Sequence, residues 1–179
     1  MKIIKITLYI IAAIIALFLV VALFVEKDYK VVRQVEINQS KAEVYEFTKY
    51  LKNQNLYSVW ATADPNMKKE YRGTDGEVGF VSAWDSEMDD VGKGEQEITK
   101  ITEGERIDYE LRFIEPFEAK DLAYMTFNAV GDSTTLVKWG FDGHMNYPMN
   151  MMLLFMDFDA MLGKDLEMGL QNLKVLLEK

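Results

Sequence analysis

The stretch PMNMMLLFMDFDAMLGKDLEMGLQNLKVLL, residues 148–177, decides the fold of this chain. Large apolar residues recur in it at steps of three or four, and charged residues take the opposite side, which is the pattern of an amphipathic helix. Because proline suits the first turn of a helix, one long helix is predicted from about Met149 to Leu177. Its apolar stripe needs a partner surface and consists of Phe155, Phe158, Leu162, Leu166, Leu170, Leu173 and Leu177.

The start of this helix is rich in methionine: seven of the eleven methionines lie between Met145 and Met168. The apolar run ends at Asp157, so it is too short to span a bilayer. Methionine is unbranched and polarizable, and it adapts to irregular shapes. The segment could therefore line a pocket for a ligand of variable shape, or it could fill gaps in an ordinary core.

A series of short strands precedes the helix and supplies its partner. Residues 28–38 are rich in β-branched side chains and predict a strand, after which a Ser40–Glu43 capping box begins a short helix that ends at about Lys52. Five or six strands separated by turns then fill residues 67–143. The clearest of them, RIDYELRF (106–113), alternates apolar and polar side chains. This order predicts an α+β domain in which an antiparallel sheet buries one face under the C-terminal helix.

The N-terminal segment ITLYIIAAIIALFLVVALFV, residues 6–25, contains no charged residue. Twenty helical residues at about 1.5 Å each span the roughly 30 Å hydrocarbon layer of a bilayer. The alternative is a cleaved signal peptide, which would end in small residues. Leu23, Phe24 and Val25 stand there instead, so an uncleaved membrane helix is the preferred interpretation.

The chain is therefore expected to have three parts: a transmembrane anchor (1–25), a short linker (26–30) and one domain (31–179). Lys2 and Lys5 favour a cytoplasmic N-terminus, although the counts of lysine and arginine on the two sides of the span nearly tie. We expect a single-pass membrane protein with an extracytoplasmic domain.

Composition excludes several classes of function. The net charge is −9 and becomes more negative without Lys2 and Lys5, so neither nucleic acid nor an anionic lipid surface is an expected electrostatic partner. The absence of cysteine excludes disulfides, thiol catalysis and cysteine metal sites. A protein partner is not indicated by any pattern.

Several segments, taken in order, resemble the START-like superfamily, also called SRPBCC. The resemblance covers about residues 26–179 and is closest to the polyketide cyclase/dehydrase-type branch that carries an N-terminal membrane segment. Gln54 and Tyr57 depart from it, because related chains often place tryptophan there. The matching segments are VEIN (35–38), SKAEVYEFTKYLKN (40–53), LYSVWATADPNM (56–67), GEQEITKI (94–101), IDYELRFIEPFEAKDLAYMTFNAVGDSTTLVKWGFDG (107–143) and FMDFDAMLGKDLEMGLQNLKVLLE (155–178).

The resemblance implies a helix-grip fold, in which a curved sheet wraps on the C-terminal helix and an apolar cavity lies between them. Related proteins bind lipids, sterols, polyketides or quinones, and some are enzymes. We therefore expect a hydrophobic small molecule or lipid as partner and no cofactor. The predicted ligand-binding residues are Trp60, Phe80, Trp84, Tyr109, Phe113, Phe127, Trp139, Phe141, Met152 and Phe155.

Catalytic and metal sites are weakly indicated. His144, the single histidine, follows the last strand and could act as a general base at a cavity mouth in a cyclase, hydratase or hydrolase, or it could be a hydrogen-bonded turn residue. In the acidic segment 85–97, Asp90 and Gln96 stand at the sixth and twelfth positions, where a calcium loop needs glycine and glutamate, so no metal is expected. A third possibility is an envelope domain that binds a protein and no ligand.

Overall fold

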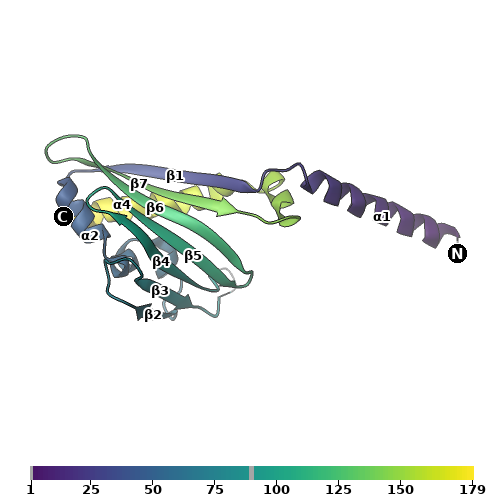
Figure 1. The fold of residues 1–179 in the computed structure, drawn as a ribbon, viewed down its shortest axis with the longest axis horizontal. Coiled ribbons are helices and arrows are strands. Elements are labelled where there is room, and N and C mark those ends of the chain that lie inside the picture. Colours follow the sequence, from purple (N-terminus) through teal and green to yellow (C-terminus); the bar gives the residue numbers. More distant parts are fainter. Residues whose placement is uncertain (1, 89–90) are drawn as a thin grey trace.

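The computed structural model describes residues 2–88 and 91–179, and a seven-stranded sheet forms the centre of the domain (Figure 1). All neighbouring strands are antiparallel, in the order β1-β7-β6-β5-β4-β3-β2, so β2 to β7 form a meander and β1 pairs with its last strand. The strands are β1 (Asp28–Ile37), β2 (Lys68–Arg72), β3 (Val81–Asp85), β4 (Lys93–Thr102), β5 (Arg106–Glu115), β6 (Ala119–Ala129) and β7 (Thr135–His144).

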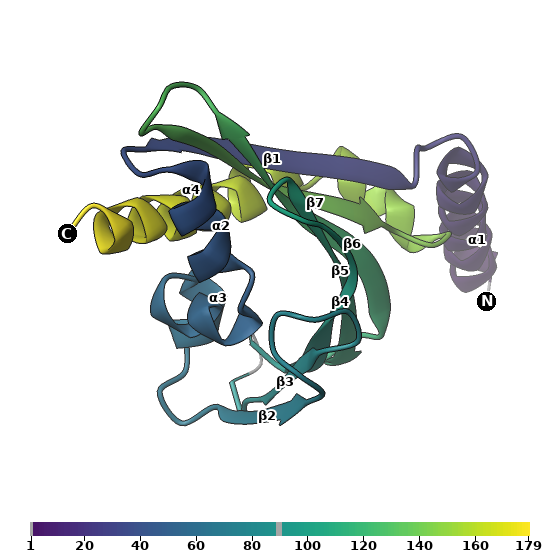
Figure 2. The same cartoon turned by 60° about the vertical axis from the view of Figure 1, so that its left-hand side comes forward.

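The sheet is curved, and the helices of the domain lie on its concave side (Figure 2). They are α2 (Lys41–Thr48), the 3₁₀-helix η1 (Leu51–Leu56), the short α3 (Val59–Thr62) and the C-terminal α4 (Phe158–Leu177). Helix α4 packs mainly along β1, where Leu166, Leu170 and Leu173 join the core. The predicted α+β helix-grip fold is confirmed.

Side-chain alternation separates the two faces of the sheet. In β1, β5, β6 and β7 the odd-numbered residues point to the inner face and form most of the core, whereas even-numbered residues carry outer contacts. On the outer face Lys30 pairs with Asp142 at 3.5 Å, and the Arg106 guanidinium lies 4.0 Å from the centre of the Tyr124 ring. The apolar alternation predicted for residues 106–113 is present in β5.

The predicted single C-terminal helix is wrong. A 3₁₀-helix, η2 (Met149–Leu154), comes first, and α4 begins only at Phe158. Asp157 separates the two elements: its carboxylate Oδ1 accepts a 2.9 Å hydrogen bond from the Ala160 N–H and caps the N-terminus of α4. The spacing of apolar residues does not indicate that the helix is interrupted at this point.

Two other predicted boundaries also shift. The capping box of Ser40 and Glu43 is present, but α2 ends at Thr48, because the Asp75 carboxylate accepts hydrogen bonds from the backbone of the next turn, including one of 2.7 Å from the Leu51 N–H. The strand expected over EVGFVSAW (77–84) begins only at Val81, since Gly79 has a φ of +89° that extended L-residues rarely adopt. Strand β1 begins at Asp28, as predicted for residues 28–38, and so overlaps the expected linker at 26–30.

Helix α1 (Lys2–Ala22) projects from one end of the domain (Figure 1). In the described part of the chain it is the one helix whose length and composition suit a membrane span, with a mean hydropathy of 2.7 over its most apolar window and none of that window buried. Its last residue, Ala22, is buried against η2. The end of α1 is thus part of the packed structure.

Candidate functional site

Aromatic side chains gather on the inner face of the sheet, where the sequence predicts a ligand cavity. Tyr109 of β5, Phe127 of β6 and Trp139 of β7 are almost fully buried. Helical residues meet them edge to face: the ring centres of Tyr57 and Trp139 lie 5.8 Å apart, and those of Tyr45 and Phe127 lie 5.4 Å apart. The helices and the sheet therefore share one aromatic core.

Polar atoms without hydrogen-bond partners lie inside this core. Among the described residues, the Tyr109 hydroxyl and the Gln54 Nε2 amide are buried and unpartnered, and the Tyr57 hydroxyl reaches only the Met125 sulfur, at 3.8 Å. Burial raises the pKa of Tyr109 well above its usual value, and the adjacent Gln54 side chain, which lies within reach of the hydroxyl, acts in the other direction. Burial likewise raises the pKa of Tyr57. These phenols stay neutral and can donate a hydrogen bond.

Nine of the ten predicted ligand-binding residues fall into three groups. Phe80, Tyr109, Phe127, Trp139 and Phe141 are buried in the core. Trp84, Phe113 and Met152 are partly buried, and the rings of Trp84 and Phe113 meet at 6.0 Å on the inner face. Trp60 is 37 % exposed at 6.1 Å from Trp139, so it lies at the edge of the aromatic group.

Phe155 contradicts the prediction that it faces the sheet. Its side chain is 78 % exposed, because the break before α4 turns this part of the chain outward. The methionines of this segment do not share one environment: Met149, Met161 and Met168 are exposed, whereas Met151 is buried. Trp139 instead approaches Gly169 of α4, where a Cβ atom would lie 2.9 Å from the ring.

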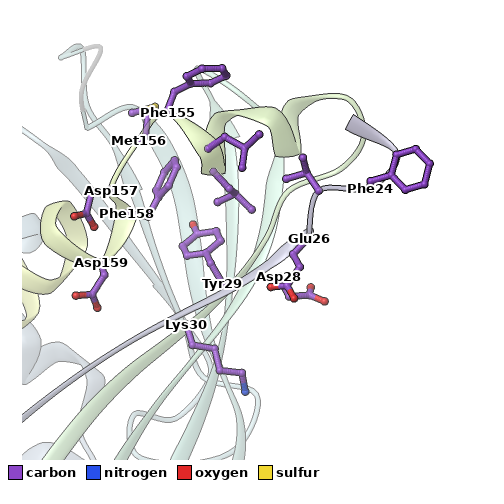
Figure 3. Close-up of a pocket in the computed structure, with 13 residues that line it drawn as sticks. Phe24, Glu26, Asp28, Tyr29, Lys30, Phe155, Met156, Asp157, Phe158 and Asp159 are labelled. Carbon is purple, nitrogen blue, oxygen red and sulfur yellow. The ribbon is translucent and has the colours of Figure 1, made fainter. Parts of the chain in front are cut away.

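Two pockets stand out on the described residues, and both lie outside this core. The first is an open groove of about 780 Å³ between residues 24–30, which follow α1 and begin β1, and residues 153–159, from the end of η2 to the start of α4 (Figure 3). Its apolar part includes Phe24, Leu154 and Phe155, and its charged part includes Glu26 and Asp159. The second, of about 920 Å³, lies between residues 64–68 and the ends of β3 and β4, and its lining is largely polar.

His144 lies on the outer face of the sheet, away from the aromatic core. Its Nδ1 is 2.6 Å from an Asp28 carboxylate oxygen, and the two residues are cross-strand neighbours in β7 and β1. Its backbone N–H donates a 2.8 Å hydrogen bond to Asp121, a buried acid on the inner face whose pKa is raised by burial. The histidine side chain is therefore separated from the candidate cavity by the sheet itself.

Gln54 stood out in the sequence only as a departure from the resemblance, and nothing in the sequence indicates that Gln54 and Asp121 are buried. Each is a single polar residue within an otherwise ordinary pattern, so periodicity does not mark it. The acidic segment considered for calcium includes Asp89 and Asp90, which lie outside the described residues. Over residues 2–88 and 91–179, no three acidic or histidine side chains come together as metal ligands would.

Comparison with known proteins was informative at the level of structure. No family model and no curated protein matches the sequence. Among solved structures, ginseng major latex-like protein 151 from Panax ginseng aligns with a TM-score of 0.60 at 15 % identity, over 86 % of this chain and all of that one. A norcoclaurine synthase from Thalictrum, in complex with a transition-state analogue, aligns with a TM-score of 0.59 at 11 % identity, over 82 % of this chain and 94 % of that one.

The protein XoxI from Bacillus cereus also aligns, with a TM-score of 0.59 at 13 % identity, over 83 % of this chain and 94 % of its own. These neighbours are START-like (SRPBCC) proteins. The chain has the START-like fold. At such low identity the likeness extends to the fold alone, so the site of this START-like domain must be argued from its own residues.

Proposed function

We propose that this START-like domain binds a lipid-like or other apolar small molecule on the inner face of its sheet, beside the bilayer that α1 spans. The observation that carries the proposal is the pair of unpartnered polar atoms, the Tyr109 hydroxyl and the Gln54 amide, within an aromatic core. Leaving a buried polar group unpaired costs about 1–3 kcal/mol. Both groups can donate, so a ligand with one acceptor oxygen and an apolar body would satisfy them.

Binding would require the surrounding side chains to move apart. Phe80, Phe127 and Trp139 would contact the apolar body, and Trp60 and Trp84 would lie at its margins. The proposal also includes membership of the polyketide cyclase/dehydrase-type branch. We assign no catalytic role to His144, because its side chain lies on the opposite face of the sheet.

The contacts of Asn150 support the part of the proposal that retains α1 as a membrane anchor. This fully buried side chain donates hydrogen bonds of 2.8 Å to the Ala22 carbonyl and 2.9 Å to the Val25 carbonyl. The last carbonyls of a helix lack partners within the helix, and here the domain supplies one. Cleavage near residue 25 would remove both acceptors, whereas an uncleaved chain keeps them. We also propose that the domain is extracytoplasmic. This part of the proposal rests only on the distribution of lysine and arginine on the two sides of α1.

The test is to identify small molecules in organic extracts of the purified full-length chain by mass spectrometry. Tyr109→Phe and Gln54→Met remove the two donors and preserve most of the side-chain volume. Tyr124→Phe removes a hydroxyl from the outer face and is the matched control. We expect one compound to be depleted several-fold in the first two variants and retained in the control. Equal recovery from all four proteins would refute the proposal.

A further inference from the structure

The 3₁₀-helix η2 presents apolar side chains outward, next to the end of α1. Leu154 and Phe155 are 57 % and 78 % exposed, and Phe24, which follows α1, is 84 % exposed. All three line the same groove, together with Val25 and Leu153. We refer to these five residues, Phe24, Val25, Leu153, Leu154 and Phe155, as the apolar rim. Exposed residues of this size are costly to leave in water when they adjoin one another.

The rim is held at the end of α1 by the buried Asn150. Because Asn150 belongs to η2 and bonds to the Ala22 and Val25 carbonyls, η2 lies within hydrogen-bonding distance of the last turn of the helix. In addition, the Met145 N–H donates a backbone hydrogen bond of 2.8 Å to the Lys27 carbonyl. This bond ties the segment after α1 to the end of β7. If α1 spans a bilayer, η2 must therefore lie where the helix leaves it.

The groove changes in polarity along its length. In Figure 3, Phe24 and Phe155 lie at opposite ends of the upper part of the groove, and Asp28, Lys30 and Asp159 lie lower in the view. This gradient from apolar to charged matches the passage from the acyl region of a bilayer to water. A protein partner would not require the apolar side to adjoin the end of a membrane span.

We propose that η2 is an interfacial membrane segment, with Leu154 and Phe155 inserted into the leaflet from which α1 emerges. The inference rests on the proposed anchoring by α1, and it goes beyond it by assigning a second membrane contact to the domain. Two contacts fix the orientation of a domain on a surface, whereas one span followed by a linker leaves it free to rotate. The groove then opens toward lipid.

The absence of cysteine allows a direct test. A single cysteine is introduced as Phe155→Cys or Leu154→Cys, labelled with an environment-sensitive fluorophore, and the full-length chain is reconstituted in phosphatidylcholine vesicles. Val175→Cys is the matched control, because Val175 is 60 % exposed near the C-terminal end of α4, far from α1 (Figure 1). Lipids carrying a nitroxide in the upper acyl chain should quench the labels at 154 and 155 at least threefold more than the label at 175.

A third label, at Ile14→Cys in the middle of α1, distinguishes the possible failures. If the label at 14 is quenched by a nitroxide deep in the acyl chain and those at 154 and 155 match the control, the interfacial role of η2 is wrong and the anchor stands. If the label at 14 is not quenched, α1 does not span the bilayer, and the interfacial role of η2 is wrong as well. A label at 155 that is shielded from water but not quenched by lipid would indicate a protein contact and would also overturn the inference.

Discussion

Asp121 is an acidic residue on the inner face of β6, in a series of otherwise apolar positions. It is almost fully buried and accepts a hydrogen bond from the His144 backbone N–H, which partly offsets the cost of removing its charge from water. Burial nevertheless raises its pKa, and burial of Tyr29 together with the charge of Asp121 raises the pKa of Tyr29 to about 12. The folded protein therefore binds a proton at Asp121 more tightly than the unfolded chain does.

Because of this pKa shift, the contribution of Asp121 to the stability of the folded protein depends on pH. A raised pKa in the folded state means that the ionised form is destabilising at neutral pH, and that this cost disappears as the pH falls through the folded pKa toward the ordinary value of about 4. We expect Asp121→Asn, which keeps the acceptor oxygen, to melt at a higher temperature than the natural chain at pH 7. The difference should shrink toward pH 4.

The matched control is Asp132→Asn, which removes one negative charge from an exposed turn. It should leave the melting temperature nearly unchanged across the same pH range. A difference for Asp121→Asn that stays constant with pH would contradict the account.

At the scale of single residues, the sequence predicts apolar positions better than polar ones. Tyr109, Phe127 and Trp139 were predicted to line a cavity under the sheet, and each is buried on its inner face. Gln54 and Asn150 could not be predicted, since a lone amide looks the same in a sequence whether it is buried or solvated. Its role depends on atoms supplied by distant segments.

The contact between α4 and the sheet depends on a close approach at Gly169. A Cβ atom there would lie 2.9 Å from Cζ3 of Trp139, which is buried in the core and has little room to move. Alanine in place of glycine favours a helix by about 1 kcal/mol, but overpacking a core costs roughly 1–3 kcal/mol. The close approach of α4 to the sheet therefore decides whether Gly169→Ala stabilises or destabilises the domain.

We expect Gly169→Ala to destabilise the domain by about 1 kcal/mol, because overpacking against Trp139 outweighs the gain in helix propensity. Thermal unfolding of the full chain in mild detergent measures the effect. Met168→Ala, on the exposed side of the same helix, should change stability by less than about 0.5 kcal/mol. Stabilisation by Gly169→Ala would show that α4 is less closely packed than described.

Asn150 links η2 to the end of α1, through its hydrogen bonds to the Ala22 and Val25 carbonyls. We expect Asn150→Ala to leave the Ala22 and Val25 carbonyls without their partner, costing roughly 1–3 kcal/mol locally, and to loosen the backbone around Lys27. Tryptic cleavage at Lys27 should become several-fold faster. Asn146→Ala, at an exposed position before η2, is the control and should cleave at the original rate. Equal rates for both variants would contradict the role given to Asn150.

At the scale of elements, regular patterns were predictive and interruptions were not. The strands from β4 to β7 appear close to their expected positions because alternation and turn residues mark them. The division of the C-terminal stretch into η2 and α4 was missed, since Phe155 continues the apolar spacing of the helix while Asp157 acts as a cap. A capping residue within a periodic stretch is ambiguous until the backbone around it is known.

At the scale of the whole molecule, the order of elements was sufficient to predict the fold, because a meander followed by one long amphipathic helix has few ways to bury both apolar faces. The placement of α1 against η2 could not be predicted, since it depends on one asparagine and on a break in a helix. The resulting arrangement puts a START-like domain, an apolar rim and a candidate membrane span in a fixed relation.

The most direct test of the central claim is native mass spectrometry of the full-length chain extracted from membranes in mild detergent. Our account predicts a protein mass that still includes residues 2–25, together with a bound apolar compound of defined mass. A mass that lacks this segment would show that α1 is removed as a signal sequence. A complete chain with no bound compound would contradict the proposed ligand site.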